Sequence, residues 1–200
     1  VQIGKPVKQI REIVHRLSEI NPMLGFRGCR LSVVYPEITE MQVKAIISAA
    51  ADAIEAGYRP LPEIMIPLVI NVREIRLITQ IIDKCIRDMA EVRPVSIRYK
   101  IGTMMETPRA TLGADRLAPE VEFMSFGTND LTQTTLGLSR DDSGRFLGSY
   151  VSQGVLSKDP FVSIDRGGVG FLVKMGIDLG RRTKPRLKTG ICGEHGGDPE

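Results

Sequence analysis

The chain has 200 residues, of which 42% are apolar and 26% are charged, and its formal net charge is +3. This length suits one domain with its own core, while the weak, dispersed positive charge and the lack of any long apolar run favour neither nucleic-acid nor membrane binding. The cysteines Cys29, Cys85 and Cys192 are few and widely spaced, so we expect reduced thiols in a cytoplasmic compartment rather than a disulfide framework.

The N-terminal half of the chain is predicted to contain three helices and two strands. Near the N-terminus, after Pro6, apolar residues recur with a helical period at Val7, Ile10, Ile13, Val14 and Leu17. The run "CRLSVV" (29–34) predicts a strand and 36–56 a long helix ended by Gly57. Residues 63–69, "EIMIPLV", then predict a second strand, and 71–90 a helix capped by Asn71.

The C-terminal half continues the alternation. Strands are expected at 96–106, 122–127 and 187–193, with helices at 109–114 and 171–182 and an irregular region up to about residue 165. About five strands that alternate with helices imply a parallel sheet, for which a doubly wound sheet and a (β/α)₈ barrel are the two candidates. Since a full barrel needs roughly 250 residues, and the first element is a helix without a preceding strand, we expect residues 1–200 to be part of a larger barrel.

Functional groups gather at the carboxyl ends of parallel strands. The predicted strands end at Glu106, at the segment 127–130 and at Cys192, while "GFRGCR" carries Arg27 just before the run 29–34 and Arg30 at its start. We therefore expect two carboxylates, an amide, a thiol and arginines on one rim.

Glu106 and Asp130 follow neighbouring strands with no histidine or cysteine beside them, a pattern that suits Mg²⁺, which takes one or two protein carboxylates. They could equally be ordinary loop acids, with Asp130 capping a short helix at "DLTQTT".

Cys192 allows several interpretations from the residues alone. It could be a buried small hydrophobe, a nucleophile with His195 as its base, or half of a zinc site with His195, although no second ligand pair follows. The arginines Arg27, Arg109 and Arg140 follow turns and could hold phosphate or carboxylate, or pair with surface acids.

Several long motifs occur together in this chain: "GFRGCRL", "YPEITEMQ", "PEIMIPLV", "IGTMMETPRA", "FMSFGTNDLTQTTLGLSRDDSGRFL" and "GICGEHGGDPE". From about Asn21 onward the chain resembles the C-terminal phosphoenolpyruvate/pyruvate-binding barrel of the pyruvate, phosphate dikinase family. Phosphoenolpyruvate synthase and enzyme I of the sugar phosphotransferase system share this barrel and remain alternatives. A non-enzymatic barrel fragment that serves as an interaction module is a further alternative.

The resemblance implies a role for each matching residue. Glu106 and Asp130 would hold the catalytic Mg²⁺, and Cys192 would donate or accept a proton at the terminal carbon of the substrate. The substrate-binding loop would consist of Gly127, Thr128 and Asn129, with Asn129 on the carboxylate.

Two arginines complete the implied site. Arg27 and Arg140 would face the phosphoryl and enolate oxygens of the substrate. This chain has Phe26 where the family usually has histidine, which bears on the orientation of the adjacent Arg27.

The resemblance also implies partners. In the family a mobile domain carries a phosphohistidine that an ATP-grasp domain charges, and with only His15 and His195 this stretch is expected to contain neither domain. We expect the swivelling phosphohistidine domain and pyruvate or phosphoenolpyruvate as partners, a homodimer at full length, and no complete ATP, phosphate and pyruvate reaction by these residues alone.

Overall fold

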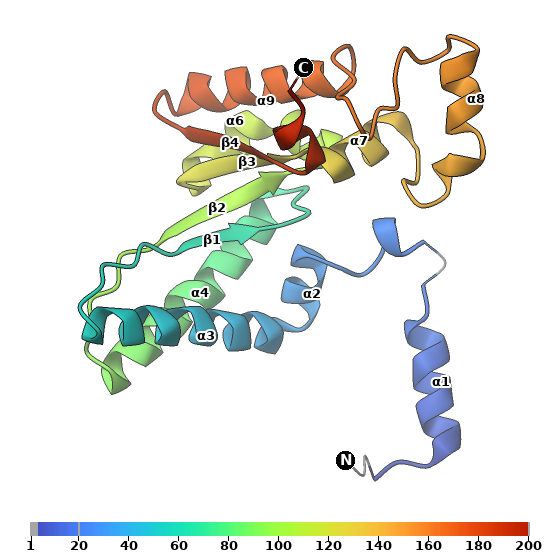
Figure 1. Cartoon of the computed structure of the whole chain (residues 1–200). Coiled ribbons are helices and arrows are strands. Elements are labelled where there is room, and N and C mark those ends of the chain that lie inside the picture. The colour runs from blue at the N-terminus through green and yellow to red at the C-terminus, as the bar shows by residue number, and fades with distance from the viewer. Residues whose placement is uncertain (1–3, 20, 200) are drawn as a thin grey trace.

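The computed structural model describes residues 4–19 and 21–199 and shows helices alternating with parallel strands (Figure 1). The strands are β1 (Glu63–Ile66), β2 (Lys100–Met105), β3 (Phe123–Gly127) and β4 (Lys188–Cys192). The α-helices are α1 (Val7–Leu17), α2 (Cys29–Val34), α3 (Pro36–Glu55), α4 (Val72–Val92), α5 (Pro108–Thr111), α6 (Ala114–Leu117), α7 (Thr128–Leu136), α8 (Leu147–Ser152) and α9 (Val169–Thr183). Short 3₁₀ turns are η1 (Pro22–Leu24), η2 (Ala118–Glu120), η3 (Ser143–Arg145) and η4 (Glu194–Gly197).

The strands form one parallel sheet in the order β1-β2-β3-β4. Each strand pairs with the one before it in the chain, so that Met65 lies beside Gly102 and Ser125 beside Gly190. A doubly wound sheet reverses its strand order at a switch point, and the described strands show no reversal. The structure thus confirms a parallel α/β sheet, with four strands ordered as in a segment of a barrel.

One face of the sheet packs against the helices. Ile66, Met105 and Phe126 point into a common apolar core with residues of α3, α4 and α9. Helix α9 can approach the sheet closely because Gly176 has no side chain, and a Cβ there would lie 2.9 Å from the Phe126 ring. Gly180 lies one turn further along the same helix. The core therefore lies between the sheet and its crossover helices.

The opposite face carries a polar network near the start of the strands. The carboxylate of Glu63 in β1 accepts hydrogen bonds from Nζ of Lys100 in β2 at 3.2 Å and from Nζ of Lys188 in β4 at 2.8 Å. The absence of a side chain at Gly102 leaves room for the Phe123 ring, whose centroid lies 5.6 Å from the Lys188 nitrogen. The ion pair between Lys188 and Glu63 joins the two outer strands, β4 and β1, across this face. Such a contact is expected for a sheet whose concave side is this face.

The predicted strand at 29–34 is wrong, because these residues form helix α2, which packs against α3 and α4. Gly28, with φ 60° and ψ −139°, turns the chain just before the helix, and the Leu31 N–H donates to its carbonyl at 3.1 Å. A short apolar run cannot be assigned to helix or strand by its periodicity alone. The sheet accordingly has four strands where about five were expected.

The remaining elements differ from the predictions mainly in their bounds. The helix from 71 is confirmed: Asn71 accepts a hydrogen bond from the Arg73 N–H, and Glu74 accepts one from the Asn71 N–H, which together form a capping box. The predicted helix at 109–114 divides into α5 and α6, and the region expected to be irregular contains α7 and α8. The helix at 171–182 is confirmed as α9.

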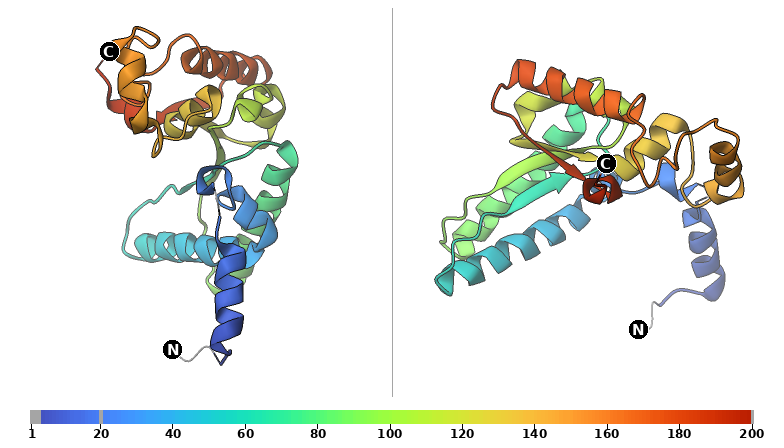
Figure 2. Two further views of the ribbon diagram at one scale, coloured as in Figure 1. Left: turned by 90° about the vertical axis from the view of Figure 1, so that its right-hand side faces the viewer. Right: turned by 45° about the horizontal axis from the view of Figure 1, so that its top comes forward.

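Helix α1 is also confirmed, and it stands away from the sheet in both views of Figure 2. None of its residues is buried. Over residues 4–19 and 21–199, no helix combines the length and the apolar composition that crossing a membrane requires.

Candidate active site

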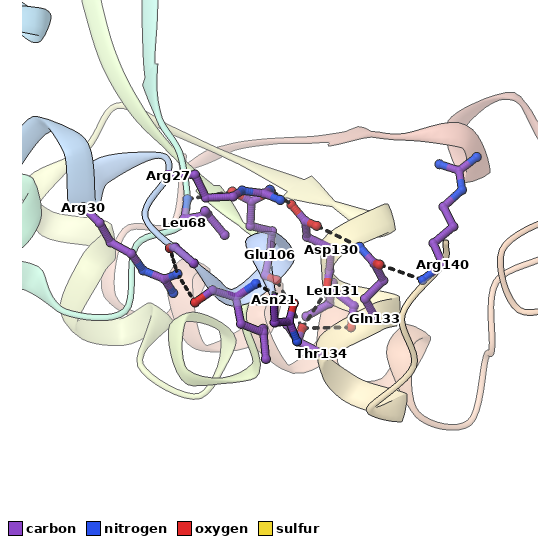
Figure 3. Close-up of polar contacts among 12 residues, drawn as sticks. Asn21, Arg27, Arg30, Leu68, Glu106, Asp130, Leu131, Gln133, Thr134 and Arg140 are labelled. Carbon is purple, nitrogen blue, oxygen red and sulfur yellow. Dashed lines mark hydrogen bonds and ion pairs between the residues drawn. The ribbon is translucent and has the colours of Figure 1, made fainter. Parts of the chain in front are cut away.

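The candidate site is built at the carboxyl end of the sheet from three successive strands and one loop. Glu106 follows β2, Asp130 lies in the first turn of α7 directly after β3, and Cys192 ends β4. Arg27 comes from the loop before α2 and reaches the same place (Figure 3). The structure therefore brings Glu106, Asp130 and Arg27 together and places Cys192 at the end of the strand next to β3, at the same edge of the sheet.

Glu106 is a buried carboxylate, with 4% of its surface exposed. Its Oε1 accepts a hydrogen bond from the Leu68 N–H at 2.6 Å, in the turn after β1. Leu68 adopts a φ of 57°, which non-glycine residues rarely do, at the point where its N–H meets the carboxylate. Burial raises the pKa of Glu106 to about 7 against the opposing effect of the Leu68 hydrogen bond, and the neighbouring Asp130 carboxylate adds to the rise.

Asp130 lies beside Glu106 and is held on both oxygens. Its Oδ2 accepts a hydrogen bond within an ion pair with Arg27, and its Oδ1 accepts one from Gln133 Nε2 at 3.0 Å. The alternative that Asp130 caps a helix is wrong, because α7 begins at Thr128, with Gly127 in the capping position. Asp130 is thus free of a capping role and belongs to the polar centre.

The loop that carries Arg27 is fixed against the end of β1. The Cys29 N–H donates to the Pro67 carbonyl at 3.1 Å, and the Cys29 thiol donates to the Leu68 carbonyl at 3.3 Å. Arg30, considered as a rim residue, instead donates from Nη1 to the Leu24 and Gly25 carbonyls and braces this loop.

Phe26, at the position next to Arg27, lies against another aromatic ring of the same segment. Its ring centroid is 5.7 Å from that of Tyr35, at the end of α2. The side chain of Arg27 nevertheless reaches Asp130, so the phenylalanine is compatible with an arginine directed into the site.

The segment after β3 is tied to the end of β4. Thr128 is fully buried, and its hydroxyl donates to the Cys192 carbonyl at 3.1 Å. The Glu194 N–H donates to Asn129 Oδ1 at 3.2 Å. Gly193 lies between these contacts with φ 103°, and a Cβ there would come within 2.5 Å of the Thr128 hydroxyl oxygen. Glycine is therefore required for this close approach.

Cys192 is half-buried and its sulfur faces the concave side of the sheet. The Ser125 hydroxyl lies 3.3 Å from Sγ, in position to donate a hydrogen bond to it, and the Phe126 carbonyl lies 3.5 Å away. Ser125 was not identified from the sequence. The alternation in "FMSFG" could have identified it, because Met124 and Phe126 face the helices and Ser125 therefore faces the opposite side, the side of Cys192.

His195 does not serve as a base for Cys192 in this structure. Its ring is buried, with 7% exposed, and Nε2 lies 2.8 Å from the Pro160 carbonyl, which makes Nε2 the donor. Among the described residues no group of three or more histidine, cysteine or acidic side chains could hold a metal together. The nucleophile and zinc interpretations therefore have no geometry to support them.

The other two arginines differ in placement. Arg140 forms an ion pair with Glu194, and its backbone N–H donates to Gln133 Oε1 at 2.9 Å, so that its backbone adjoins Gln133 while its side chain extends away from Asp130 (Figure 3). Arg109 lies on α5 and lines a separate small hollow with Asn71 and Arg116. Arg109 is thus outside the candidate site.

The donor set fits a hard divalent cation. Glu106 and Asp130 present carboxylate oxygens from adjacent strand ends, close enough for one to raise the pKa of the other. In the structure the charge of Asp130 is balanced by Arg27. Two adjacent carboxylates with no nitrogen or sulfur donor match the preference of Mg²⁺ for oxygen ligands.

Comparison with known proteins covers nearly the whole chain. Residues 2–200 match the family model for the PEP-binding domain of PEP-utilising enzymes. The chain is 50% identical over 198 residues to pyruvate, phosphate dikinase 1, chloroplastic, of Arabidopsis thaliana, which covers 99% of the chain and 21% of that protein. It is 55% identical over 190 residues to the protein of the same name from Oryza sativa subsp. japonica, which covers 93% of the chain and 20% of that protein.

A third relative, pyruvate, phosphate dikinase, chloroplastic, of Flaveria bidentis, is 51% identical over 199 residues, covering 100% of the chain and 21% of that protein. The chain thus spans about a fifth of the length of these curated relatives. The family resemblance inferred from the motifs is confirmed, and the chain belongs to the PEP-binding domain family of the PEP-utilising enzymes.

Proposed function

We propose that this chain is the phosphoenolpyruvate/pyruvate half-site of a pyruvate, phosphate dikinase, the enzyme type that converts ATP, pyruvate and phosphate to AMP, phosphoenolpyruvate and diphosphate. The observation that carries the proposal is the cluster of Glu106, Asp130 and Arg27 at the edge of the sheet where Cys192 also ends its strand. The names of the relatives favour the dikinase over phosphoenolpyruvate synthase or an enzyme I.

Negative charge develops on the enol oxygen when phosphoenolpyruvate loses its phosphoryl group. Glu106 and Asp130 would hold Mg²⁺, which when bound neutralises charge on substrate oxygens. Arg27 lies next to Asp130, so its guanidinium is positioned to bind phosphoryl or enolate oxygens once a cation takes over the balance of the Asp130 charge.

Arg140 and the loop after β3 would hold the rest of the substrate. Glu194, in η4 just after β4, orients the Arg140 side chain, and the Glu194 N–H fixes the oxygen of the Asn129 side-chain amide. That contact leaves the amide nitrogen of Asn129 free to donate to the substrate carboxylate, the role that the family resemblance implies. Gly127 carries no side chain, and a Cβ there would lie 2.8 Å from Glu106 Oε2, which keeps the space over the carboxylate open.

Cys192 would transfer the proton at the terminal carbon. The enolate must gain a proton at carbon to become pyruvate, and in the reverse direction pyruvate must lose one. The sulfur of Cys192 lies at the end of β4, two strands from Glu106, with Ser125 as a hydrogen-bond donor. This arrangement supports a thiol that acts as acid and base rather than as a nucleophile.

The domain around these residues would be a barrel that works with a second, mobile domain. The sequentially ordered sheet suits one part of a (β/α)₈ barrel. The phosphoryl group would come from a phosphohistidine on a swivelling domain, and the full-length protein would be a homodimer. A cytoplasmic location stays a prediction, since the names of the relatives include the word chloroplastic.

Proton exchange at the methyl group of pyruvate tests the proposal. In the full-length protein, with Mg²⁺ and phosphate in D₂O, proton NMR should show the methyl signal decaying. Asp130→Ala and Cys192→Ala should each slow the decay by at least about 100-fold, the usual contribution of a positioned acid–base group. Cys85→Ala, a substitution of the same type at a buried cysteine in α4, is the control. Exchange at the control rate in the Cys192 variant would refute the proton-transfer role.

A further inference from the structure

Gln133 connects two candidate substrate-site residues, Asp130 on α7 and Arg140 in the loop that follows it. The side chain lies on α7, one turn after Asp130, and only 8% of Gln133 is exposed. Its Nε2 donates to Asp130 Oδ1 at 3.0 Å, and its Oε1 accepts from the Arg140 N–H at 2.9 Å (Figure 3). One buried amide thus bridges a carboxylate and the backbone of the loop that carries Arg140.

The chemistry of the two partners fixes which end of the amide faces which residue. A backbone N–H can only donate, so the group opposite Arg140 must be the oxygen. An ionised carboxylate can only accept, so the group opposite Asp130 must be the nitrogen. Of the side chains of similar size, glutamine alone offers a donor and an acceptor at the end of the same three-carbon stem.

The contact determines how Asp130 is presented. Gln133 holds Oδ1, and this leaves Oδ2 to face Arg27. Thr134, the next residue on α7, donates from its hydroxyl to the Asp130 carbonyl at 2.7 Å and lies 3.3 Å from the Glu106 carbonyl. The backbone of this turn is therefore fixed against the end of β2, so that the rotation of the Asp130 carboxylate depends on its two side-chain partners, Gln133 at Oδ1 and Arg27 at Oδ2.

We infer that Gln133 is a positioning residue that orients the Asp130 carboxylate for its ligand and couples this orientation to the loop bearing Arg140. The inference rests on the proposed function, because it assigns Gln133 a role toward the Mg²⁺ and substrate that Asp130 and Arg140 would bind. Partners of this kind behind a metal ligand usually change metal affinity or activity by about 10-fold to 100-fold when removed.

Two substitutions separate the two ends of the amide. Gln133→Met keeps the length of the side chain and removes both hydrogen bonds. Gln133→Glu keeps an oxygen that can accept from the Arg140 N–H and removes the amide N–H that donates to Asp130. Gln80→Met, at an exposed position of α4, is the matched control.

The experiment measures two quantities in the full-length protein. Calorimetric titration gives the affinity for oxalate, an enolate mimic, in the presence of Mg²⁺, and hydrogen–deuterium exchange follows the Arg140 amide. Both Gln133 variants should bind oxalate about 10-fold to 100-fold more weakly than the control variant. Exchange at Arg140 should accelerate in Gln133→Met and stay near the wild-type rate in Gln133→Glu.

A variant whose circular dichroism is native but which binds oxalate as tightly as the control, or more tightly, would overturn the inference, even if its melting temperature fell. Because Gln133→Glu preserves the contact to the loop, it keeps the test valid should Gln133→Met fail to fold. Failure of the wild-type protein to bind oxalate with Mg²⁺ would refute the proposed function and this inference with it. Normal wild-type binding with unchanged variants would refute the role of Gln133 alone.

Discussion

Replacing Glu106 with glutamine should make the chain more stable above neutral pH. The carboxylate is 4% exposed, and its pKa is raised from the ordinary value of 4.5 to about 7, chiefly by burial. Between these two values the folded chain binds more protons at Glu106 than the unfolded chain, so the contribution of Glu106 to stability is greatest below pH 4.5 and is lost as the pH rises through 7. Glutamine keeps an oxygen for the Leu68 N–H and carries no charge.

The magnitude follows from the two pKa values. The interval from 4.5 to about 7, at about 1.4 kcal/mol for each pH unit, corresponds to about 3 kcal/mol. The Glu106→Gln variant should therefore exceed the wild type in free energy of unfolding by about 3 kcal/mol at pH 8.5, and by much less at pH 5. Added Mg²⁺ should narrow the difference at pH 8.5, because a bound cation offsets the buried charge.

Urea unfolding followed by far-ultraviolet circular dichroism measures this effect, since the chain contains no tryptophan. Curves are recorded from pH 5 to 8.5 with a chelator present. Glu122→Gln is the control, because the Glu122 carboxylate also accepts a backbone N–H, from Ile101 at 2.9 Å, but is exposed. If the wild type and the Glu106 variant keep a constant difference across this range, the argument from burial is incorrect.

Two glycine positions give further predictions. Gly193→Ala should lower the free energy of unfolding by about 1–3 kcal/mol, because φ is 103° and the new Cβ would lie 2.5 Å from the Thr128 oxygen. Gly176→Ala should lower it by a similar amount, about 1–3 kcal/mol, since its Cβ would meet the Phe126 ring at 2.9 Å. Thermal unfolding by circular dichroism checks both, with Gly148→Ala in α8, which has open space around it, as the control. A melting temperature equal to that of the control variant would contradict the close approach at either position.

The sequence was sufficient for the positions of the candidate site because topology determines them. In a parallel sheet every strand points the same way, so residues such as Glu106 and Cys192 must lie at one edge once their strands are assigned. Glu106 and Asp130 could be predicted as a pair of metal ligands for the same reason, without knowledge of any side-chain contact.

The rest depended on tertiary contacts that a sequence pattern does not contain. The run 29–34 became helical because Gly28 turns the chain and the helix packs on α3 and α4. Leu68 contributes to the site through its backbone N–H, which donates to Glu106, and its residue type does not indicate this contact or its unusual φ. Gln133 resembles any polar residue on a helix until its two partners are known.

The contact between Glu63 and Lys188 has a geometric consequence at the other end of the strands. In a flat sheet, groups on β2 and β4 stand about 10 Å apart and groups on β1 and β4 about 14 Å apart, because neighbouring strands are separated by about 4.8 Å. When a sheet bends so that its outer strands share an ion pair, the side chains on its concave face converge toward one region. Under the proposed function, the carboxylates after β2 and on α7 and the thiol of β4 would act on one small substrate in that region.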